Sequence, residues 1–212
     1  MNYLDIINKC LSELNFRQVE DFSDLIKPEH QRIKNYINLV AQDVCSSMNW
    51  NFLLRQEELT LPAGTKTVAN NIYGRILAVY IDGIKYNYCE NFQLFLKYRD
   101  RGRVFSVFND KFLFPEFEEN KLINIIYYTR NLAVSAENQE KSYLEEADDK
   151  ALIPEPFTEQ ILVYGTCLRL KGDPQHVKFS YWQDMYNAAL ANMRSKIAID
   201  ADYTPFVRLF RR

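Results

Sequence analysis

The sequence has few of the residue types that build catalytic or ligand sites. Among its 212 residues are six glycines, too few and too scattered for a glycine-rich phosphate-binding loop. It has two histidines, His30 and His176, far apart in the chain, whereas a metal site needs three or four convergent ligands. No serine or cysteine lies in a nucleophile-elbow pattern. The sequence therefore predicts a protein that is not an enzyme and has no metal or other cofactor.

Cysteines and long apolar runs are also scarce. No two cysteines have the spacing of metal ligands, which favours small buried hydrophobic side chains in a reducing compartment; they are Cys10, Cys45, Cys89 and Cys167. The longest uninterrupted apolar run, Ile76 to Ile81, is too short to cross a bilayer. The first residues lack the basic and apolar regions of a secretory signal. We expect a soluble chain that is made in the cytoplasm and has no membrane association.

Charge of one sign is not in large excess, because the formal net charge is -2. A dedicated nucleic-acid-binding domain is usually strongly basic, so this balance argues against one, although a local basic surface could still face DNA. Aromatic residues are frequent at 14%. Because tyrosine offers a large apolar area with a polar tip and is enriched at interfaces, this slightly favours a protein that binds other proteins.

Helical patterns lie at both ends of the chain, around a middle with strand patterns. Apolar residues repeat at helical spacing from Leu4 to Leu14 and from Ile33 to Met48, separated by a polar loop from Asn15 to Lys27. Two further helical patterns run from Ile153 to Lys171 and from about Gln175 to Ile197. The short break between them, Gly172-Asp173-Pro174, predicts an antiparallel helical hairpin.

The middle of the chain contains strands and turn signals. Asp82-Gly83 is a strong two-residue hairpin signal and Asn109-Asp110 a weaker one, with a short helix expected from Asn91 to Tyr98. We therefore predict an α+β fold: a four-helix core formed by N- and C-terminal helix pairs, with a β-rich insertion lobe between them. The predicted division is residues 1–50 for the N-terminal helices, 51–130 for the β-rich insertion, 131–152 for an acidic linker, 153–198 for the C-terminal helical hairpin and 199–212 for a docking tail.

Basic residues gather in two places. The first cluster is expected on a loop that could face DNA or a partner, with a solvated turn as the alternative; it comprises Lys97, Arg99, Arg101 and Arg103. This cluster carries the alternative function, a nucleic-acid-binding regulatory protein. The second cluster mixes arginines with large hydrophobic residues that resist solvation, which predicts docking on a partner or on the protein's own body. It comprises Tyr203, Phe206, Val207, Arg208, Leu209, Phe210, Arg211 and Arg212.

Several segments together resemble the head-to-tail adaptor group of tailed bacteriophages, including tail tubular protein A. After a helix come Asn49-Trp50-Asn51-Phe52, a strand that ends at Leu61-Pro62, and Arg75-Ile76-Leu77-Ala78-Val79. Near the end of the chain come Ile153-Pro154 before a helix, Gly172-Asp173 at the turn, and then Tyr181, Tyr186 and Ala188-Ala189-Leu190. The likeness covers about residues 1 to 197 and consists of apolar positions and turns.

The resemblance implies a structural protein of the virion neck or tail, synthesised in the host cytoplasm. It implies a ring of about twelve copies that joins the portal protein to the tail or nozzle proteins. The ring would form part of the genome channel for DNA ejection, with transient, nonspecific contact with the genomic DNA. The C-terminal segment from Tyr203 to Arg212 would dock on the portal. A ring needs two different faces on each subunit, and in the last helix Tyr181, Met185 and Leu190 lie off the main apolar stripe, so we expect them to contact a neighbouring subunit.

Overall fold

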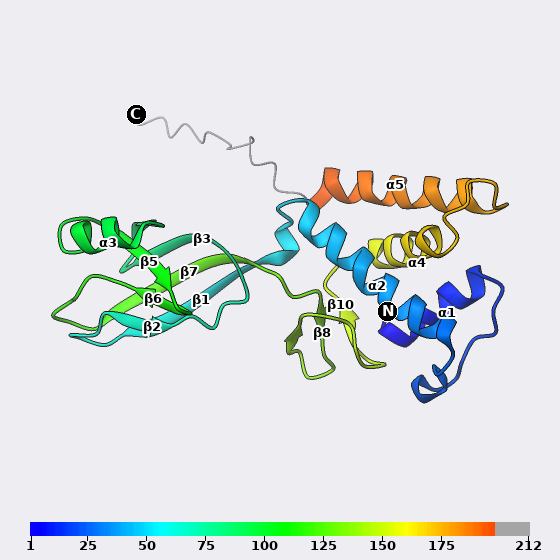
Figure 1. Ribbon diagram of the computed structural model, residues 1–212, viewed down its shortest axis with the longest axis horizontal. Helices are drawn as coiled ribbons and strands as arrows, with labels where there is room; N and C mark the ends of the chain where they lie inside the picture. The colour runs from blue at the N-terminus through cyan, green and yellow to red at the C-terminus, as the bar shows by residue number, and fades with distance from the viewer. Residues whose placement is uncertain (198–212) are drawn as a thin grey trace, which may run out of the picture. The chain divides into compact units, whose positions relative to one another are not determined.

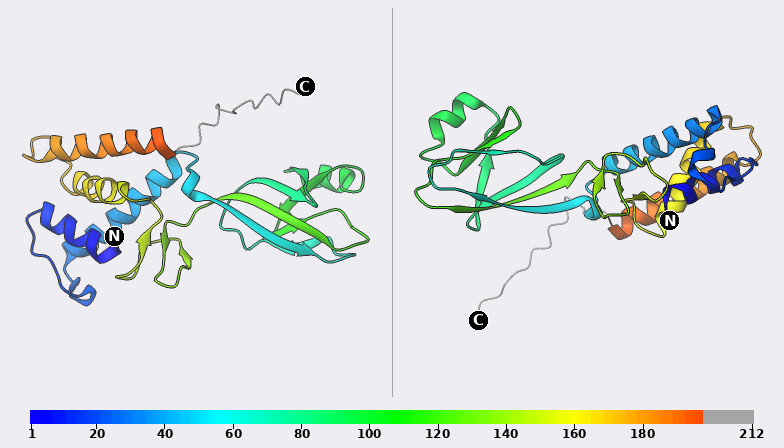
Figure 2. Two further views of the ribbon diagram at one scale, coloured as in Figure 1. Left: turned by 180° about the vertical axis from the view of Figure 1, so that it is seen from behind. Right: turned by 90° about the horizontal axis from the view of Figure 1, so that it is seen from below.

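The computed structural model describes residues 1–197, and the chain folds as two compact units (Figures 1 and 2). The helical unit comprises residues 1–53 and 130–197 of the described chain, and the β unit comprises residues 54–129. The predicted docking residues Tyr203 to Arg212 lie outside the described residues. The predicted α+β class is confirmed.

The first two helices of the helical unit begin where local chemistry favours a helix start. α1 (Tyr3–Glu13) is capped reciprocally, since the Asn2 side chain accepts from the Asp5 N–H at 2.9 Å while the Asp5 carboxylate accepts from the Asn2 N–H at 3.1 Å. α2 (Pro28–Ser47) has proline at its first position, where a missing N–H costs nothing. Two short 3₁₀ turns, Phe22–Asp24 and Asn51–Leu53, precede and follow α2.

The other two helices of this unit are α4 (Phe157–Leu170) and α5 (Phe179–Ile197). They contact each other, and α4 also contacts α1 and α2 (Figure 1). α4 can approach closely because Gly165 has no side chain: a Cβ there would lie 2.8 Å from Val40 Cγ1 and 2.9 Å from Tyr186 Cε2. Both α2, through Val40, and α5, through Tyr186, therefore pack closely against α4 at this glycine.

The β unit is built on one seven-stranded sheet in the order β1-β7-β3-β4-β5-β6-β2. Its strands are β1 (Leu54–Leu61), β2 (Thr67–Ala69), β3 (Gly74–Ile81), β4 (Ile84–Tyr88), β5 (Val104–Phe108), β6 (Lys111–Leu113) and β7 (Lys121–Thr129). All neighbours are antiparallel except β4 and β5, which are parallel and separated in sequence by the short helix α3 (Phe92–Tyr98).

Both predicted hairpins are present in this sheet. Asp82 and Gly83 join β3 to β4 with φ of 49° and 78°, and Asn109 and Asp110 join β5 to β6 with φ of 49° and 54°. Two successive positive φ angles match the right-handed twist of the strands. One face of the sheet forms a buried apolar core, whose members are Leu61, Val79, Ile81, Phe105, Phe112, Phe114, Ile123 and Ile125.

The segment 131–152 contains a second, three-stranded sheet that the prediction of an acidic linker did not include. Its order is β10-β8-β9, with β8 (Ala133–Val134), β9 (Glu140–Lys141) and β10 (Lys150–Ala151). The strands are only two residues long, so no periodicity signals them. One acidic residue of this segment, Asp149, is buried, with 1% of its surface exposed.

Asp149 is buried because the fold supplies it with donors. Its carboxylate accepts the N–H groups of Glu145 and Glu146, both at 2.8 Å, and Lys141 Nζ at 3.1 Å. Burial by itself raises the pKa of Asp149, but the two N–H groups and Lys141 outweigh it and hold the pKa below its ordinary value. The loop is also held to α2 by Asn38, whose side chain bonds both the N–H and the carbonyl of Leu144.

Candidate interaction surfaces

The described residues bring together no group of three or more His, Cys, Asp or Glu side chains that could hold a metal ion. His30 is buried in α2, and His176 stacks on Trp182 with ring centroids 5.0 Å apart. Both histidines therefore have packing roles in the helical unit. None of the helices through residue 197 combines the length and apolar character that crossing a membrane needs.

The residues predicted to contact a neighbouring subunit all lie on α5. Tyr181 is 49% exposed, and its hydroxyl lies 3.2 Å from that of Tyr164 on α4. Met185 and Leu190 are half-buried. At about 100° per residue, Met185 lies on the same side of α5 as Tyr181, whereas Leu190 lies on the opposite side. The three residues therefore do not form one patch, and their role stays a prediction.

The predicted basic cluster lies at the end of α3 and in the loop after it. Lys97, Arg101 and Arg103 are exposed. Arg99 is half-buried, and its Nε lies 3.5 Å from the Asp100 carboxylate. Residues 97–103 thus carry four basic residues and one acidic residue, a local net charge of +3.

The helix that carries this cluster also exposes large apolar side chains on both flanks. Only Phe95 of α3 is buried. At about 100° per residue, Phe92 and Leu96 lie on one side of it, and Leu94 and Tyr98 on the other. We call this the α3 surface; it comprises Phe92, Leu94, Leu96, Lys97, Tyr98 and Arg101, all exposed. The sequence predicted the helix but not this exposure, because the apolar repeat on a seven-residue helix does not show how many of its sides are covered.

A second apolar and charged surface lies between α1 and α2, in the segment predicted as a polar loop. Residues 20–26, which we call the knob, contain three acidic residues and no basic ones, a local net charge of -3. Ile26 is 80% exposed at its end, whereas the preceding Leu25 is buried. The sequence analysis missed one signal here, the adjacent apolar residues Leu25 and Ile26 in a polar loop. Because consecutive side chains rarely point the same way, one of the two can be buried while the other is exposed.

The knob is held in place by several contacts from the helices on either side. The Asn8 side chain donates to the Val19 carbonyl and accepts from the Val19 N–H, both at 2.9 Å. Gln31 Nε2 donates to the Leu25 carbonyl at 2.8 Å. Lys34 Nζ lies 3.9 Å from the centroid of the Phe22 ring. The loop is therefore preorganised, and it presents Ile26 in a defined position.

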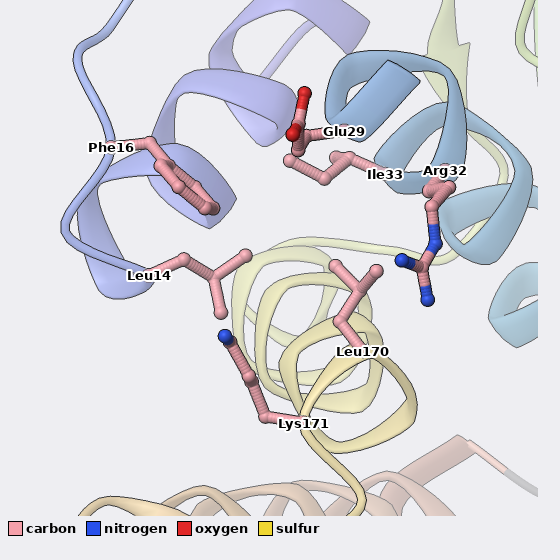
Figure 3. A pocket seen from close by; sticks show the side chains of 7 residues that line it. All are labelled: Leu14, Phe16, Glu29, Arg32, Ile33, Leu170 and Lys171. Atoms are coloured by element: carbon pink, nitrogen blue, oxygen red, sulfur yellow. The ribbon is translucent and has the colours of Figure 1, made fainter.

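A small pocket opens where α1 ends, α2 begins and α4 ends (Figure 3). Its volume is about 90 Å³, which suits one apolar side chain of a partner and is well below the usual size of a substrate site. Leu14 and Leu170 face each other across it, with Lys171 and Arg32 beside them (Figure 3). The lining residues are Leu14, Phe16, Glu29, Arg32, Ile33, Leu170 and Lys171.

The α3 surface, the knob and the pocket are the candidate interaction features of the described residues. A family model described as SU10 adaptor protein matches residues 1–209. No curated protein matches the chain.

Proposed function

Since the chain belongs to the SU10 adaptor protein family, a family of phage head-to-tail adaptors, we propose that it is a structural connector that joins the portal to the tail of a bacteriophage. The broader resemblance found in the sequence is confirmed by this membership, whereas the narrower likeness to tail tubular protein A stays a prediction. Membership implies a component of the virion neck, and a structural adaptor is not expected to be an enzyme.

The proposed connector works as a closed ring, of about twelve copies, with the portal protein above and the tail or nozzle proteins below. The ring would form part of the genome channel and touch the DNA transiently during ejection. Exposed large apolar side chains on both units, such as Ile26 and Leu96, support this proposal, because association would remove them from water. A heterologous contact needs two different surfaces on each copy, and the knob and the α3 surface are two such surfaces.

We propose that the parts of the chain share this work. α1, α2, α4 and α5, within residues 1–50 and 153–198, would form the adaptor core, and residues 51–130 the inserted β lobe. Residues 131–152 would connect them, and the tail at 199–212 would dock on the portal after synthesis in the host cytoplasm. The exposure of Tyr181, 49% of its surface, supports the use of that side of α5 as an interface.

The single observation that carries this proposal is the family match across residues 1–209, which covers both compact units. Multi-angle light scattering of the purified protein tests it, alone and with portal rings. We expect a ring-sized species in at least one condition. A mass that stays at one chain over all concentrations, with and without portal, would refute the connector proposal.

A further inference from the structure

We propose that the knob of one copy docks on the α3 surface of the next copy, and that this is the contact by which copies associate side by side. The inference rests on the proposed function, because it names the surfaces that a ring of these chains would use. The knob lies in the helical unit and the α3 surface in the β unit, so the two are different patches of one chain. A contact between them on successive copies is heterologous, which is the kind that closes into rings.

Charge complementarity points to a second copy as the partner. Residues 20–26 carry a net charge of -3 on Glu20, Asp21 and Asp24. Within the described part of the chain, the one cation shown in contact with them is the Lys34 ammonium, which lies against the Phe22 ring. Residues 97–103 carry a net charge of +3. Opposed potentials of this kind steer association and exclude wrong partners, since contact between like charges is unfavourable. The same complementarity disfavours two copies that meet knob to knob or α3 to α3.

The apolar side chains of the two surfaces also suit each other. Ile26 is 80% exposed, although an aliphatic side chain gains by leaving water. The α3 surface offers leucine, phenylalanine and tyrosine side chains around a seven-residue helix, and Phe92 continues it onto Phe108 with ring centroids 4.9 Å apart. Aromatic and arginine side chains are typical of protein interfaces. Leucine side chains would stay uncovered against a phosphate backbone, so the surface favours protein over nucleic acid.

Preorganisation of the knob strengthens this inference. Asn8, Gln31 and the buried Leu25 fix the loop before any partner arrives, so little conformational entropy is lost on docking. Neither Glu20 nor Asp24 uses its side chain to hold the loop, because the fixing contacts go through Val19, Asp21 and Leu25. Both carboxylates therefore remain available to a neighbour, and both can be reversed without dismantling the loop.

Charge reversal of each surface, and of both together, tests the contact in the full-length chain. One variant carries Glu20→Lys and Asp24→Lys, a second carries Lys97→Glu and Arg101→Glu, and a third carries all four changes. We expect each two-residue variant to need at least about tenfold more protein for half-maximal assembly, and the four-residue variant to assemble nearly as the wild type does. Recovery also shows that the reversed residues do not prevent folding. Native mass spectrometry and sedimentation velocity measure the assembled fraction, with portal rings added in parallel.

Matched controls reverse exposed charges elsewhere: Glu118→Lys with Glu137→Lys, and Lys85→Glu with Lys111→Glu. They should assemble as the wild type does. If the wild type assembles and all reversal variants assemble equally well, the knob contact is wrong and the connector function stands. If the wild type assembles under no condition, the connector function itself fails. Salt-sensitive DNA binding that is lost in the Lys97→Glu, Arg101→Glu variant, with assembly unchanged, would assign the α3 surface to nucleic acid instead and overturn the inference.

A chemical cross-link separates contact between copies from contact within one chain. In a Cys89→Ser background, Ile26→Cys and Leu96→Cys are introduced on two separate chains, which are mixed and treated with a bis-maleimide. We expect a product of two chains that requires both cysteines. With both cysteines on one chain at high dilution, a product of single-chain mass would place the knob on its own α3 surface and overturn the inference.

Discussion

The indole Nε1 of Trp182 donates a hydrogen bond to the Glu13 carboxylate across 3.0 Å, which ties α5 to the end of α1. Trp182 is fully buried, so its N–H needs a partner inside the protein. Lys178 joins the same group, with its Nζ 2.9 Å from the Glu13 carbonyl oxygen and 3.3 Å from its carboxylate. The first and last described helices are thereby fastened by one acidic side chain.

Glu13→Ala should therefore lower the free energy of unfolding by about 1–3 kcal/mol, because it leaves the buried indole N–H of Trp182 without an acceptor. Urea unfolding followed by tryptophan fluorescence measures the change. Glu137→Ala is the matched control, since Glu137 is an exposed acidic residue of the same unit. Equal unfolding midpoints for the two variants would show that the Glu13 contact contributes nothing to stability.

Gly165→Ala should destabilise the helical unit, although alanine is the better helix former by up to about 1 kcal/mol. Its new methyl group would lie within 2.9 Å of both Val40 and Tyr186, so α2 or α5 must move away, at a cost of about 1–3 kcal/mol. Gly172→Ala is the control, because the nearest atom to a Cβ there is the Leu168 carbonyl oxygen at 3.6 Å. If thermal unfolding gives Gly165→Ala a melting temperature equal to or higher than that of Gly172→Ala, the close packing around Gly165 is contradicted.

Asp149→Asn should destabilise the helical unit by about 2–3 kcal/mol near neutral pH, because a charged acceptor of three donors is lost. The pKa of Asp149 is lowered in the folded protein, so its contribution is present above the ordinary aspartate pKa of about 3.9 and is lost as the pH falls through the folded value. The difference in stability between the wild type and the variant should therefore be smaller in acid than near neutral pH. The same difference at pH 2.5 and pH 7 would show that the charge plays no part.

We expect that deletion of Phe206 to Arg212, the segment with the proposed docking role, leaves the melting temperature unchanged. It should weaken portal binding by about tenfold or more, because aromatic and arginine side chains are those that most often dominate an interface. Surface plasmon resonance on immobilised portal rings provides the measurement. A truncated chain that binds portal as tightly as the full chain would remove the docking role of this segment.

The elements with a local signal were predictable from the sequence. Asp82-Gly83 forms the predicted turn between β3 and β4 with two positive φ angles, and the apolar repeat from Ile33 to Met48 predicted most of α2. The strands of residues 133–151 were not predictable, since they are two residues long, and the loop between the last two is held by the long-range bonds of Asn38 to Leu144. The acidic composition of this segment predicted a linker, and only the three-dimensional contacts show that Asp149 is buried.

The candidate surfaces were less predictable than the fold. The charges of residues 97–103 can be read from the sequence. The exposure of Leu94 and Leu96 beside them cannot, because it depends on how little of α3 is covered by the rest of the fold. For the knob the sequence predicts only a polar loop, because composition does not reveal which of Leu25 and Ile26 points outward. Exposure is a property of the whole fold. A sequence pattern therefore locates charged residues more reliably than it locates interfaces.

Electron microscopy of the purified protein mixed with portal rings tests the central claim most directly. The connector account predicts an added ring of density beneath the portal, coaxial with its channel and built from repeated copies of this chain. Portal rings that show no added density, even with this protein in large excess over the portal, would contradict it.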